Sequence, residues 1–241
     1  APAEATVTEE QGLRVMLAAA CRRLHARGLL AGAEGNLSCR LPNGDLLVTA
    51  SGVDKGAIDH THVLRVHADG ALWREARAHA PTGDPQPHDT THRPSSELGM
   101  HLACYAARAD VHAIVHAHPP AATGFAAAGI PIPADVLPEL PVVVGPIAMV
   151  PYGRPGTPAL ADAMRPFLAS HEVFLLANHG VTALGRSIED ALLRMESVEQ
   201  SARILAVAHL LGGAKSLPPV EAAALASLHP RYEDTARTNI G

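Results

Sequence analysis

The sequence predicts an α/β fold in which helices cover both faces of a mixed, mostly antiparallel sheet. Apolar runs of strand length alternate with segments of helical periodicity, and turn signals join at least two pairs of strands. Aliphatic residues dominate the 47% hydrophobic content, and aromatic residues make up only 3% of the 241 residues. Hairpins give antiparallel pairs, and an aliphatic core suits helices packed on a sheet. We expect a single domain over residues 1–241, because no segment resembles a linker between two cores.

The first third of the chain is expected to form a helix and two hairpins. Thr8-Glu9-Glu10-Gln11 has the form of a capping box, and apolar residues follow it at helical spacing as far as Gly28. Asn43-Gly44 then separates two apolar runs, which is a strong hairpin signal. A second hairpin is expected over residues 63–73, with Asp69-Gly70 as its turn.

The rest of the chain alternates strands and helices after an irregular, proline-containing segment at residues 80–94. A serine is expected to cap the helix that follows this segment. The predicted strands are 111–118, 142–144, 147–150 and 173–177. The predicted helices are 95–108, 157–170, 187–212 and 220–228. Residues 131–141 contain too many prolines for a regular element.

Two histidines at the end of a buried strand are the first candidate metal ligands. Side chains alternate faces along a strand, so His116 and His118 point to the same side with Cβ atoms about 7 Å apart. Pro119-Pro120 would end the strand there and place the pair at the sheet's edge, within reach of a ligand. Two imidazoles at this spacing can converge on one metal ion. In a chain with 15 histidines, two hydrogen-bonded structural residues are the alternative.

A third histidine follows another apolar run. Residues 173–177 predict a strand that is covered on both faces, and Asn178-His179-Gly180 comes directly after it. A histidine beside a glycine at the end of such a strand is unusual for packing alone. Three histidines at strand ends, with one carboxylate at a helix start, match a metal site that has three imidazoles and one exchangeable position.

Three segments of small residues could bind an anion. The first hairpin returns Ser51-Gly52 to a position beside Gly35-Asn36, and such turns can direct N–H groups and a hydroxyl at one anion. Ser95 and Ser96 add two hydroxyls and the free N–H groups of a helix start. Glu97 is either a carboxylate of this site or a residue that favours the helix dipole. Ordinary tight turns are the alternative for the two loops.

Charge and cysteine content exclude several function classes. The chain has 19 Lys and Arg against 24 Asp and Glu, a net charge of −5, and no basic cluster. We therefore expect a small-molecule partner, with no nucleic acid and no anionic membrane surface. Three widely spaced cysteines predict free thiols in a reducing compartment. With no leader-like start and no apolar run of about 18 residues, a cytoplasmic, soluble protein is expected.

Six short motifs resemble the class II aldolase/adducin family. They occur in the family's order over nearly the whole chain, as Gly35-Asn36-Leu37-Ser38, Ser51-Gly52, Pro94-Ser95-Ser96-Glu97, His116-Ala117-His118, Pro151-Tyr152 with Pro155-Gly156-Thr157, and Asn178-His179-Gly180. The sequence looks most like the bacterial L-fuculose-1-phosphate aldolase branch. That branch also includes rhamnulose-phosphate aldolases, ribulose-5-phosphate 4-epimerases, a methylthioribulose-phosphate dehydratase and some decarboxylases. The resemblance implies a three-layer α/β/α domain and a homo-oligomer, with a tetramer favoured.

The resemblance also implies one zinc ion, or another divalent metal, in each subunit. The implied ligands are His116, His118 and His179, with Glu97 as the acid/base that can also complete the metal shell. The residues that fall where the family binds substrate phosphate are Asn36, Ser51, Gly52, Ser95 and Ser96. Tyr232 is a candidate proton donor from the C-terminal tail. The aldolase branch has a further tyrosine that reaches a neighbouring subunit's site, whereas the matching position here is about Leu137.

The function that the resemblance implies is a zinc-dependent carbon–carbon lyase of carbohydrate metabolism. It would cleave a phosphorylated ketose, such as L-fuculose 1-phosphate, to dihydroxyacetone phosphate and an aldehyde through a metal-stabilised enediolate. The alternative is a decarboxylase, epimerase or dehydratase on the same scaffold, acting on a related acid or sugar phosphate. The missing tyrosine near Leu137 keeps the decarboxylase open. A non-catalytic, adducin-like interaction module is disfavoured, because all three histidines and Glu97 are present.

Overall fold

The computed structural model describes residues 7–73 and 92–229. The strands in these ranges are β1 (Asn36–Arg40), β2 (Leu46–Thr49), β3 (Val63–Val66), β4 (Ala113–Ala117), β5 (Ile147–Val150), β6 (Val173–Leu176) and β7 (Gly180–Gly185). The helices are α1 (Val7–Ala26), α2 (Leu98–Ala107), α3 (Pro120–Ala128), α4 (Pro158–Leu168), α5 (Ile188–Leu210) and α6 (Pro219–Ala226). Two short helical turns are η1 (His60–His62) and η2 (Leu140–Val144).

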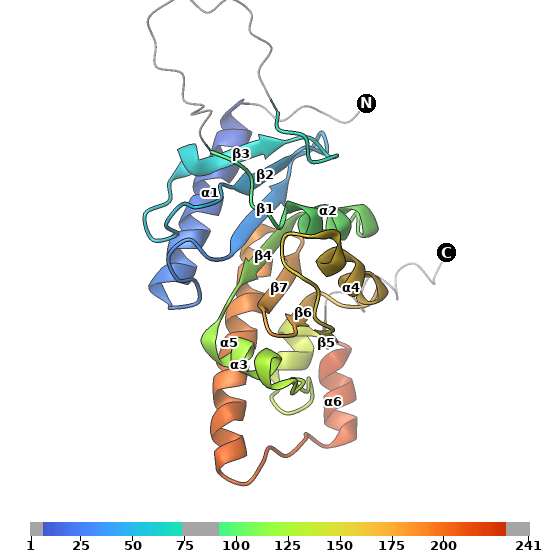
Figure 1. Ribbon diagram of the computed structural model, residues 1–241. Helices are drawn as coiled ribbons and strands as arrows, with labels where there is room; N and C mark the ends of the chain where they lie inside the picture. The colour runs from blue at the N-terminus through green and yellow to red at the C-terminus, as the bar shows by residue number, and fades with distance from the viewer. Residues whose placement is uncertain (1–6, 74–91, 230–241) are drawn as a thin grey trace, which may run out of the picture.

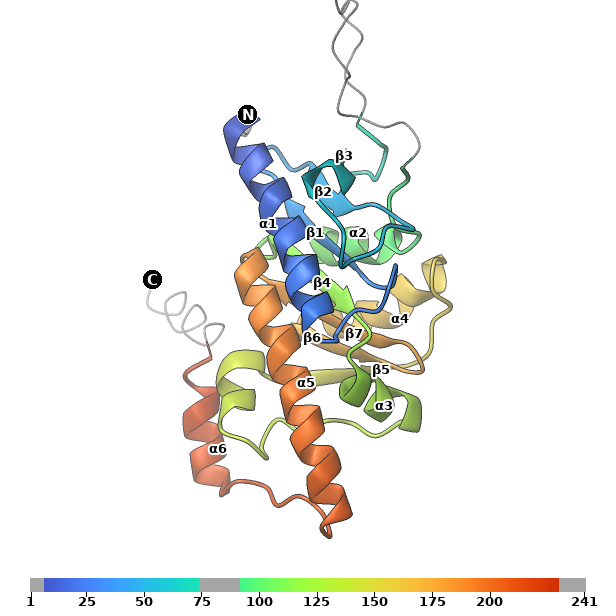
Figure 2. The same ribbon diagram turned by 90° about the vertical axis from the view of Figure 1, so that its left-hand side faces the viewer.

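The described strands form one sheet in the order β3-β2-β1-β4-β7-β6-β5 (Figure 1). Only β5 and β6 pair in parallel among these strands, and the other neighbours are antiparallel. Helices lie on both faces, with α1 and α5 in front of the sheet in Figure 2. The three-layer α/β/α fold with a mixed, mostly antiparallel sheet is confirmed.

Two apolar cores fill the spaces between the layers. The first packs α1, α3 and α5 on one face, and the second packs α2 and α4 on the other. Strand β4 contributes to both, because alternate side chains point to opposite faces. Val115 and Ala117 enter the first core, and Ile114 enters the second. The strand that ends at the histidine pair is therefore buried on both faces, which holds its end in place.

Some expected local structures differ from the observed ones near the chain start and near α2. Helix α1 already includes Thr8, so the predicted capping box does not begin it. Glu97, not a serine, is the N-cap of α2, and the Ser95 hydroxyl instead accepts the Glu97 N–H at 3.2 Å. The second hairpin is present as predicted, with the Gly70 N–H donating to the His67 carbonyl at 2.8 Å across the Asp69-Gly70 turn and Leu72 forming an antiparallel bridge with Val66. Most of the irregular segment at 80–94 lies outside the described residues.

Three further differences lie around the second half of the sheet. Residues 142–144, predicted as a strand, belong to the helical turn η2, where Pro141 has no N–H for a strand ladder. Helix α3 was not predicted, although Pro120 at its start and Gly129 with φ 69° at its end are typical helix boundaries. Strand β7 was also not predicted, because two glycines and a threonine weaken its apolar pattern.

A buried polar contact connects α2 to β1. The Ser38 hydroxyl oxygen lies 2.6 Å from His101 Nδ1 and 2.9 Å from the Tyr105 hydroxyl oxygen. Burial, and to a smaller extent the nearby His116, lowers the pKa of His101 to about 3. The imidazole of His101 is therefore neutral in the folded protein near pH 7, whereas an exposed histidine titrates near pH 6.5.

We expect the free energy of unfolding to fall as the pH is lowered below about 6.5. Between the unfolded and folded pKa values of His101, the unfolded chain binds one more proton, so the contribution is complete above pH 6.5 and is lost toward pH 3. This group alone adds a slope of up to about 1.4 kcal/mol per pH unit. Urea unfolding of the wild type and His101→Gln across this range measures the slope. An equal slope in both proteins would contradict the prediction.

Candidate metal centre

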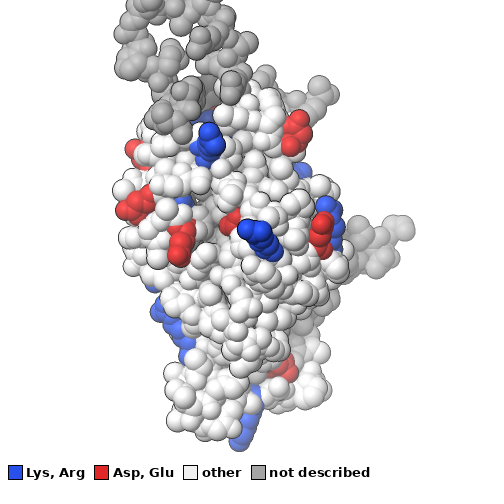
Figure 3. Space-filling model, viewed as in Figure 1, with Lys and Arg blue, Asp and Glu red and all other residues white. Residues whose placement is uncertain are grey.

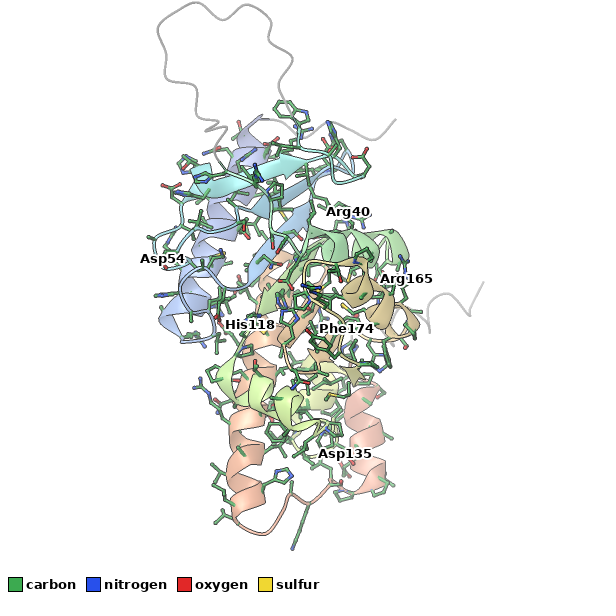
Figure 4. All side chains as sticks on the ribbon, in the orientation of Figure 1. Arg40, Asp54, His118, Asp135, Arg165 and Phe174 are labelled. Carbon is green, nitrogen blue, oxygen red and sulfur yellow. The ribbon has the colours of Figure 1, made fainter. Side chains whose placement is uncertain are left out.

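Three histidine side chains converge where β4 and β7 meet. His116 is in β4, His118 follows that strand directly, and His179 lies in the turn between β6 and β7. One ligand atom from each histidine lies within 4.8 Å of the others. Figure 4 shows His118 where β4 leads into α3. All three predicted ligands are thus together, at the end of the central strand β4 and in the turn between β6 and β7.

Backbone features in two of the sequence motifs make this convergence possible. Asn178 has φ 57°, a conformation that asparagine tolerates better than most residues, and it turns the chain from β6 into β7. A Cβ atom on Gly180 would lie 2.6 Å from both the Ala117 carbonyl oxygen and His118 Cδ2. A Cβ atom on Gly35 would lie 2.6 Å from the His116 carbonyl oxygen. Both glycines therefore allow the backbone segments before β1 and at the start of β7 to approach β4 closely.

Hydrogen bonds on the far side of two rings orient the ligand nitrogens. His116 Nδ1 lies 3.0 Å from the Val181 carbonyl oxygen, and His118 Nδ1 lies 3.2 Å from Glu34 Oε2. A carbonyl or carboxylate oxygen only accepts, so both Nδ1 atoms carry hydrogen. In a neutral ring, Nε2 then keeps its lone pair for a metal ion. The two Nε2 atoms lie 3.3 Å apart, facing one another across the candidate site.

The carboxylate of Glu97 lies against the same nitrogens. Its Oε2 is 3.3 Å from His116 Nε2, and its Oε1 is 3.1 Å from His179 Nε2. Burial by itself would raise the pKa of Glu97, but the close ion-pair contacts with the His116 and His179 rings outweigh burial and lower that pKa below its ordinary value. Glu97 is therefore ionised, and its Oε2 also accepts a hydrogen bond from Asn36 Nδ2 at 2.8 Å.

The donor set fits a divalent metal ion. Two ligand atoms at about 2.1 Å from one tetrahedral zinc ion lie about 3.4 Å apart, and the spacing of the His116 and His118 Nε2 atoms is close to this value. Glu97 Oε1, although buried, has no hydrogen-bond partner among the described residues. A cation held by three imidazoles would satisfy that oxygen. Neutral nitrogen ligands with one nearby carboxylate are typical of zinc and of several other divalent transition metals.

The predicted anion-binding segments lie next to one another. Ala50 pairs with Pro94, and the Ser51 N–H donates to the Arg93 carbonyl at 2.8 Å. These contacts place Ser51-Gly52 against the segment that leads into α2. Ser51, Gly52 and Ser96 are exposed, and Ser95 is partly buried. Asn36 differs from the others, because it is only 4% exposed and directs its amide at Glu97.

Lys55, for which the sequence predicted no role, connects the loop before Asn36 to the Ser51-Gly52 turn. Its backbone N–H donates to the Gly32 carbonyl at 2.8 Å, and its ammonium group donates to Val53 at 3.0 Å and to Ala33 at 3.3 Å. The residue is only 1% exposed, and burial lowers its pKa. A lysine three residues after a Ser-Gly turn gives no sequence signal of burial. Glu34 was missed too, although it directly precedes a quoted motif.

Two tyrosine predictions have different outcomes. Tyr232 lies outside the described residues. Leu137, at the position where a tyrosine was noted as absent, is partly buried against the first core. A leucine side chain has no proton to donate, so this position cannot replace the missing phenol.

The surface in view and the described helices were compared with the predicted absence of a basic cluster and of a long apolar run. On the face shown in Figure 3, positive and negative side chains are interspersed and no continuous positive patch is visible. Among the helices of the two described ranges, none combines the length and apolarity needed to cross a membrane.

Comparison with known proteins identifies the family. The family described as "Class II Aldolase and Adducin N-terminal domain" matches residues 15–206. The 3-oxo-tetronate 4-phosphate decarboxylase of Escherichia coli K12 is 34% identical over 200 residues, which cover 81% of this chain and 87% of that protein. The 5-deoxy-D-ribulose 1-phosphate aldolase of Bacillus thuringiensis serovar kurstaki is 31% identical over 213 residues, covering 88% and 92%.

The solved structures agree with this result. A structure of L-fuculose 1-phosphate aldolase superimposes with a TM-score of 0.79 at 26% identity, covering 95% of this chain and 98% of that one. The family match spans most of the chain, and the named relatives are enzymes. The chain therefore belongs to the class II aldolase and adducin N-terminal domain family.

Proposed function

We propose that the chain is a metal-dependent decarboxylase acting on a phosphorylated 3-oxo acid. The strongest support is that two different features lie next to each other. One is an ionised Glu97 among three imidazoles, and the other is a set of turns suited to binding an anion. His116, His118 and His179 would hold one divalent ion, for which zinc is the best match. The substrate phosphate would bind at Ser51, Gly52, Ser95 and Ser96, with Asn36 between the two features.

The comparisons favour this reading over the ketose-phosphate aldolase that we expected first. The relative with 34% identity is named a decarboxylase, whereas the structure named L-fuculose 1-phosphate aldolase has 26% identity. The absence of a phenol at Leu137 points in the same direction. Loss of carbon dioxide releases no aldehyde, so no phenol is needed to exchange a proton with the hydroxyl oxygen that becomes the aldehyde oxygen.

The chemistry is the same in outline for both activities. In a 3-oxo acid, the bond between the carboxylate and C2 breaks, carbon dioxide leaves, and the electron pair is delocalised onto the C3 oxygen. A divalent ion, when bound, supplies a Lewis acid that stabilises this developing charge by several kcal/mol. A proton must then be added at C2. From a 3-oxo-tetronate 4-phosphate, the balanced products are carbon dioxide and dihydroxyacetone phosphate.

Glu97 is suited to move this proton. Its carboxylate is ionised, so it can take a proton from water and deliver it to carbon. One oxygen is held by Asn36, and the other has no hydrogen-bond partner among the described residues. Tyr232 remains a candidate second proton donor from the C-terminal tail.

A ketose-phosphate aldolase is the second candidate function. The relative named 5-deoxy-D-ribulose 1-phosphate aldolase covers 88% of the chain at 31% identity, a match close to that of the decarboxylase. Both activities break a bond next to a carbonyl and leave the electron pair delocalised onto oxygen. The same three histidines and Glu97 would serve either reaction, so only the group that leaves the carbon next to the carbonyl separates them.

We further propose that the chain forms a homo-oligomer, with a tetramer favoured. Helix α5 exposes several apolar side chains, with Leu193 at 49%, Val207 at 55% and Leu210 at 87% exposure. Large exposed apolar side chains on one helix support an interface with another copy of the chain.

The ligand assignment predicts that His179→Ala loses most of its metal. Removing one of three imidazoles leaves too few protein ligands for tight binding. Elemental analysis of protein purified without added metal should show one divalent ion per wild-type chain and a small fraction of that in the variant. His112→Ala is the control, because His112 is an exposed histidine directly before β4 and is not one of the proposed ligands. Full occupancy in His179→Ala would remove His179 from the ligand set.

We predict that Glu97→Gln keeps the fold and the metal but loses turnover by about 10²–10⁴-fold, because an amide cannot carry the proton. The rate of carbon dioxide release, with elemental analysis alongside, tests this. Glu189→Gln is the control, since Glu189 is a carboxylate in the first turn of another helix. Equal rates for the wild type and Glu97→Gln would leave Glu97 with only a helix-dipole role.

The substrate assignment predicts carbon dioxide release from 3-oxo-tetronate 4-phosphate with kcat/KM at least about 10²-fold above that for the unphosphorylated acid, because the anion-binding turns would otherwise be unfilled. The same preparation is assayed for triose phosphate released from 5-deoxyribulose 1-phosphate and L-fuculose 1-phosphate. Faster cleavage of either ketose phosphate would reverse the order of the two candidate functions. Equal rates with and without the phosphate would remove the phosphate assignment.

A further inference from the structure

A ladder of polar contacts runs behind Glu97, between facing sides of β1 and α2. Its members on α2 are spaced by four residues and those on β1 by two, so each set shares one face: Glu97, His101 and Tyr105, and Asn36, Ser38 and Arg40. At the site end, Asn36 Nδ2 lies 2.8 Å from Glu97 Oε2, and Asn36 Oδ1 lies 2.5 Å from His101 Nε2.

The ladder continues away from the site. Ser38 bridges His101 Nδ1 and the Tyr105 hydroxyl, and Arg40 donates to the Tyr105 carbonyl oxygen at 2.6 Å. The Arg40 guanidinium also lies 4.8 Å from the centre of the Tyr105 ring. Figure 4 shows Arg40 well separated from His118 along the sheet. The imidazole of His101 is thus held on both sides, and it is only 2% exposed.

The donor and acceptor roles in this ladder follow from the Asn36 amide, whose NH2 group lies against Glu97 Oε2 and whose oxygen lies against His101 Nε2. An ionised carboxylate only accepts, so Asn36 turns its NH2 group toward Glu97 and its oxygen toward His101. That oxygen also only accepts, so His101 carries its hydrogen on Nε2. The neutral ring then accepts at Nδ1 from the Ser38 hydroxyl, which in turn accepts from Tyr105. Every donor therefore points toward Glu97.

This direction has a consequence for the Asn36 amide, which has two orientations of similar shape. The reversed amide would place its oxygen against Glu97 Oε2 and its NH2 against the N–H of His101, giving two repulsive contacts. If His101 could not donate, only Glu97 would select the orientation of the amide. The buried Asn36 oxygen would then also lack its partner, which is unfavourable for a polar group removed from water.

We propose that His101 is a positioning residue, which fixes the Asn36 amide and through it the orientation of the Glu97 carboxylate. Asn36 holds Oε2, so that Oε1 stays directed at His179 and is available for proton transfer. Among the described residues, the hydrogen bonds of His101 go to Asn36 and Ser38 and to none of the three histidines. The inference rests on the role proposed for Glu97, and its test therefore includes a readout that needs no turnover.

The kinetic test compares His101→Leu, which removes the donor, with His101→Gln, whose amide can still donate to Asn36. His101→Leu should lower kcat by about 10–100-fold, as loss of a partner behind a functional group commonly does, with a smaller change in KM. His101→Gln should recover most of the rate. Cys104→Ala is the control, because Cys104 is buried on the same helix and a cavity there destabilises α2 without contact with Asn36. An equal loss of kcat in Cys104→Ala would show a structural role only.

A double-mutant cycle separates an effect through Asn36 from an independent one. In the Asn36→Ala background, His101→Leu should cause no further loss of kcat, because the amide that it positions is gone. Multiplied losses in the double variant would overturn the proposal. Should His101→Leu fail to fold, Ser38→Ala replaces it in the cycle, since it keeps the ring but removes the donor that selects its Nε2–H form.

The readout without turnover is the side-chain amide signal of Asn36 in a ¹⁵N spectrum of the full chain, assigned by its loss in Asn36→Asp. This signal should shift in His101→Leu and stay near the wild-type position in His101→Gln. An unchanged signal in His101→Leu would overturn the proposal. If the wild type releases neither carbon dioxide nor triose phosphate, the proposed function fails, and the amide signal still decides whether His101 positions Asn36.

Discussion

The pairing of β4 with its two neighbours is the constraint on which the site depends. The register places Asn36 of β1 and Thr182 of β7 opposite His116, so groups from distant parts of the chain meet at one residue. Gly35 and Gly180 permit this approach, since a side chain at either position would collide with the backbone of β4. A shift of one residue would turn His116 into the opposite core and separate it from Glu97. Sheet pairing thus defines the site as much as the histidines themselves.

The electrostatics of the site follow from this arrangement. His116 donates through Nδ1 to a carbonyl, so its Nε2 can also donate to Glu97 only when the ring is protonated. A metal ion bound by the three histidines would place a positive charge beside Glu97. That charge and the hydrogen bond from Asn36 would both favour the ionised carboxylate and one direction of the ladder through Asn36 and His101. The histidines in front of Glu97 and the hydrogen-bonded ladder behind it thus favour the same orientation of its carboxylate.

The same arrangement of residues is compatible with both a decarboxylase and an aldolase. Both reactions need an anion site for phosphate, a Lewis acid near a carbonyl and a group that moves a proton. The predicted ligands and the adjoining turns provide a setting for all three, so the first coordination sphere does not distinguish the reactions. What differs is the space and chemistry around the leaving group. The comparison with the aldolase branch pointed to one such difference, Leu137 in place of a phenol.

Much of the fold and the candidate site could be predicted from sequence, because local rules govern them. Period-two alternation put His116 and His118 on one side of a strand, and Asn43-Gly44 marked the first hairpin. The family motifs identified His179 and Glu97 as partners. The errors also have local causes: η2 occupies a valine run that favours strands, and β7 has too weak a pattern to be recognised.

The contacts that connect those residues could be found only in the tertiary structure. Nothing near Lys55 or His101 in the sequence shows that these side chains are buried or which groups they contact. Asn36 was expected to face an anion, but in the fold its amide connects Glu97 to His101. Local patterns determine the direction of a side chain relative to its own strand or helix. Its partners depend on the register between elements that are far apart in the chain, and that register results from packing the whole sheet.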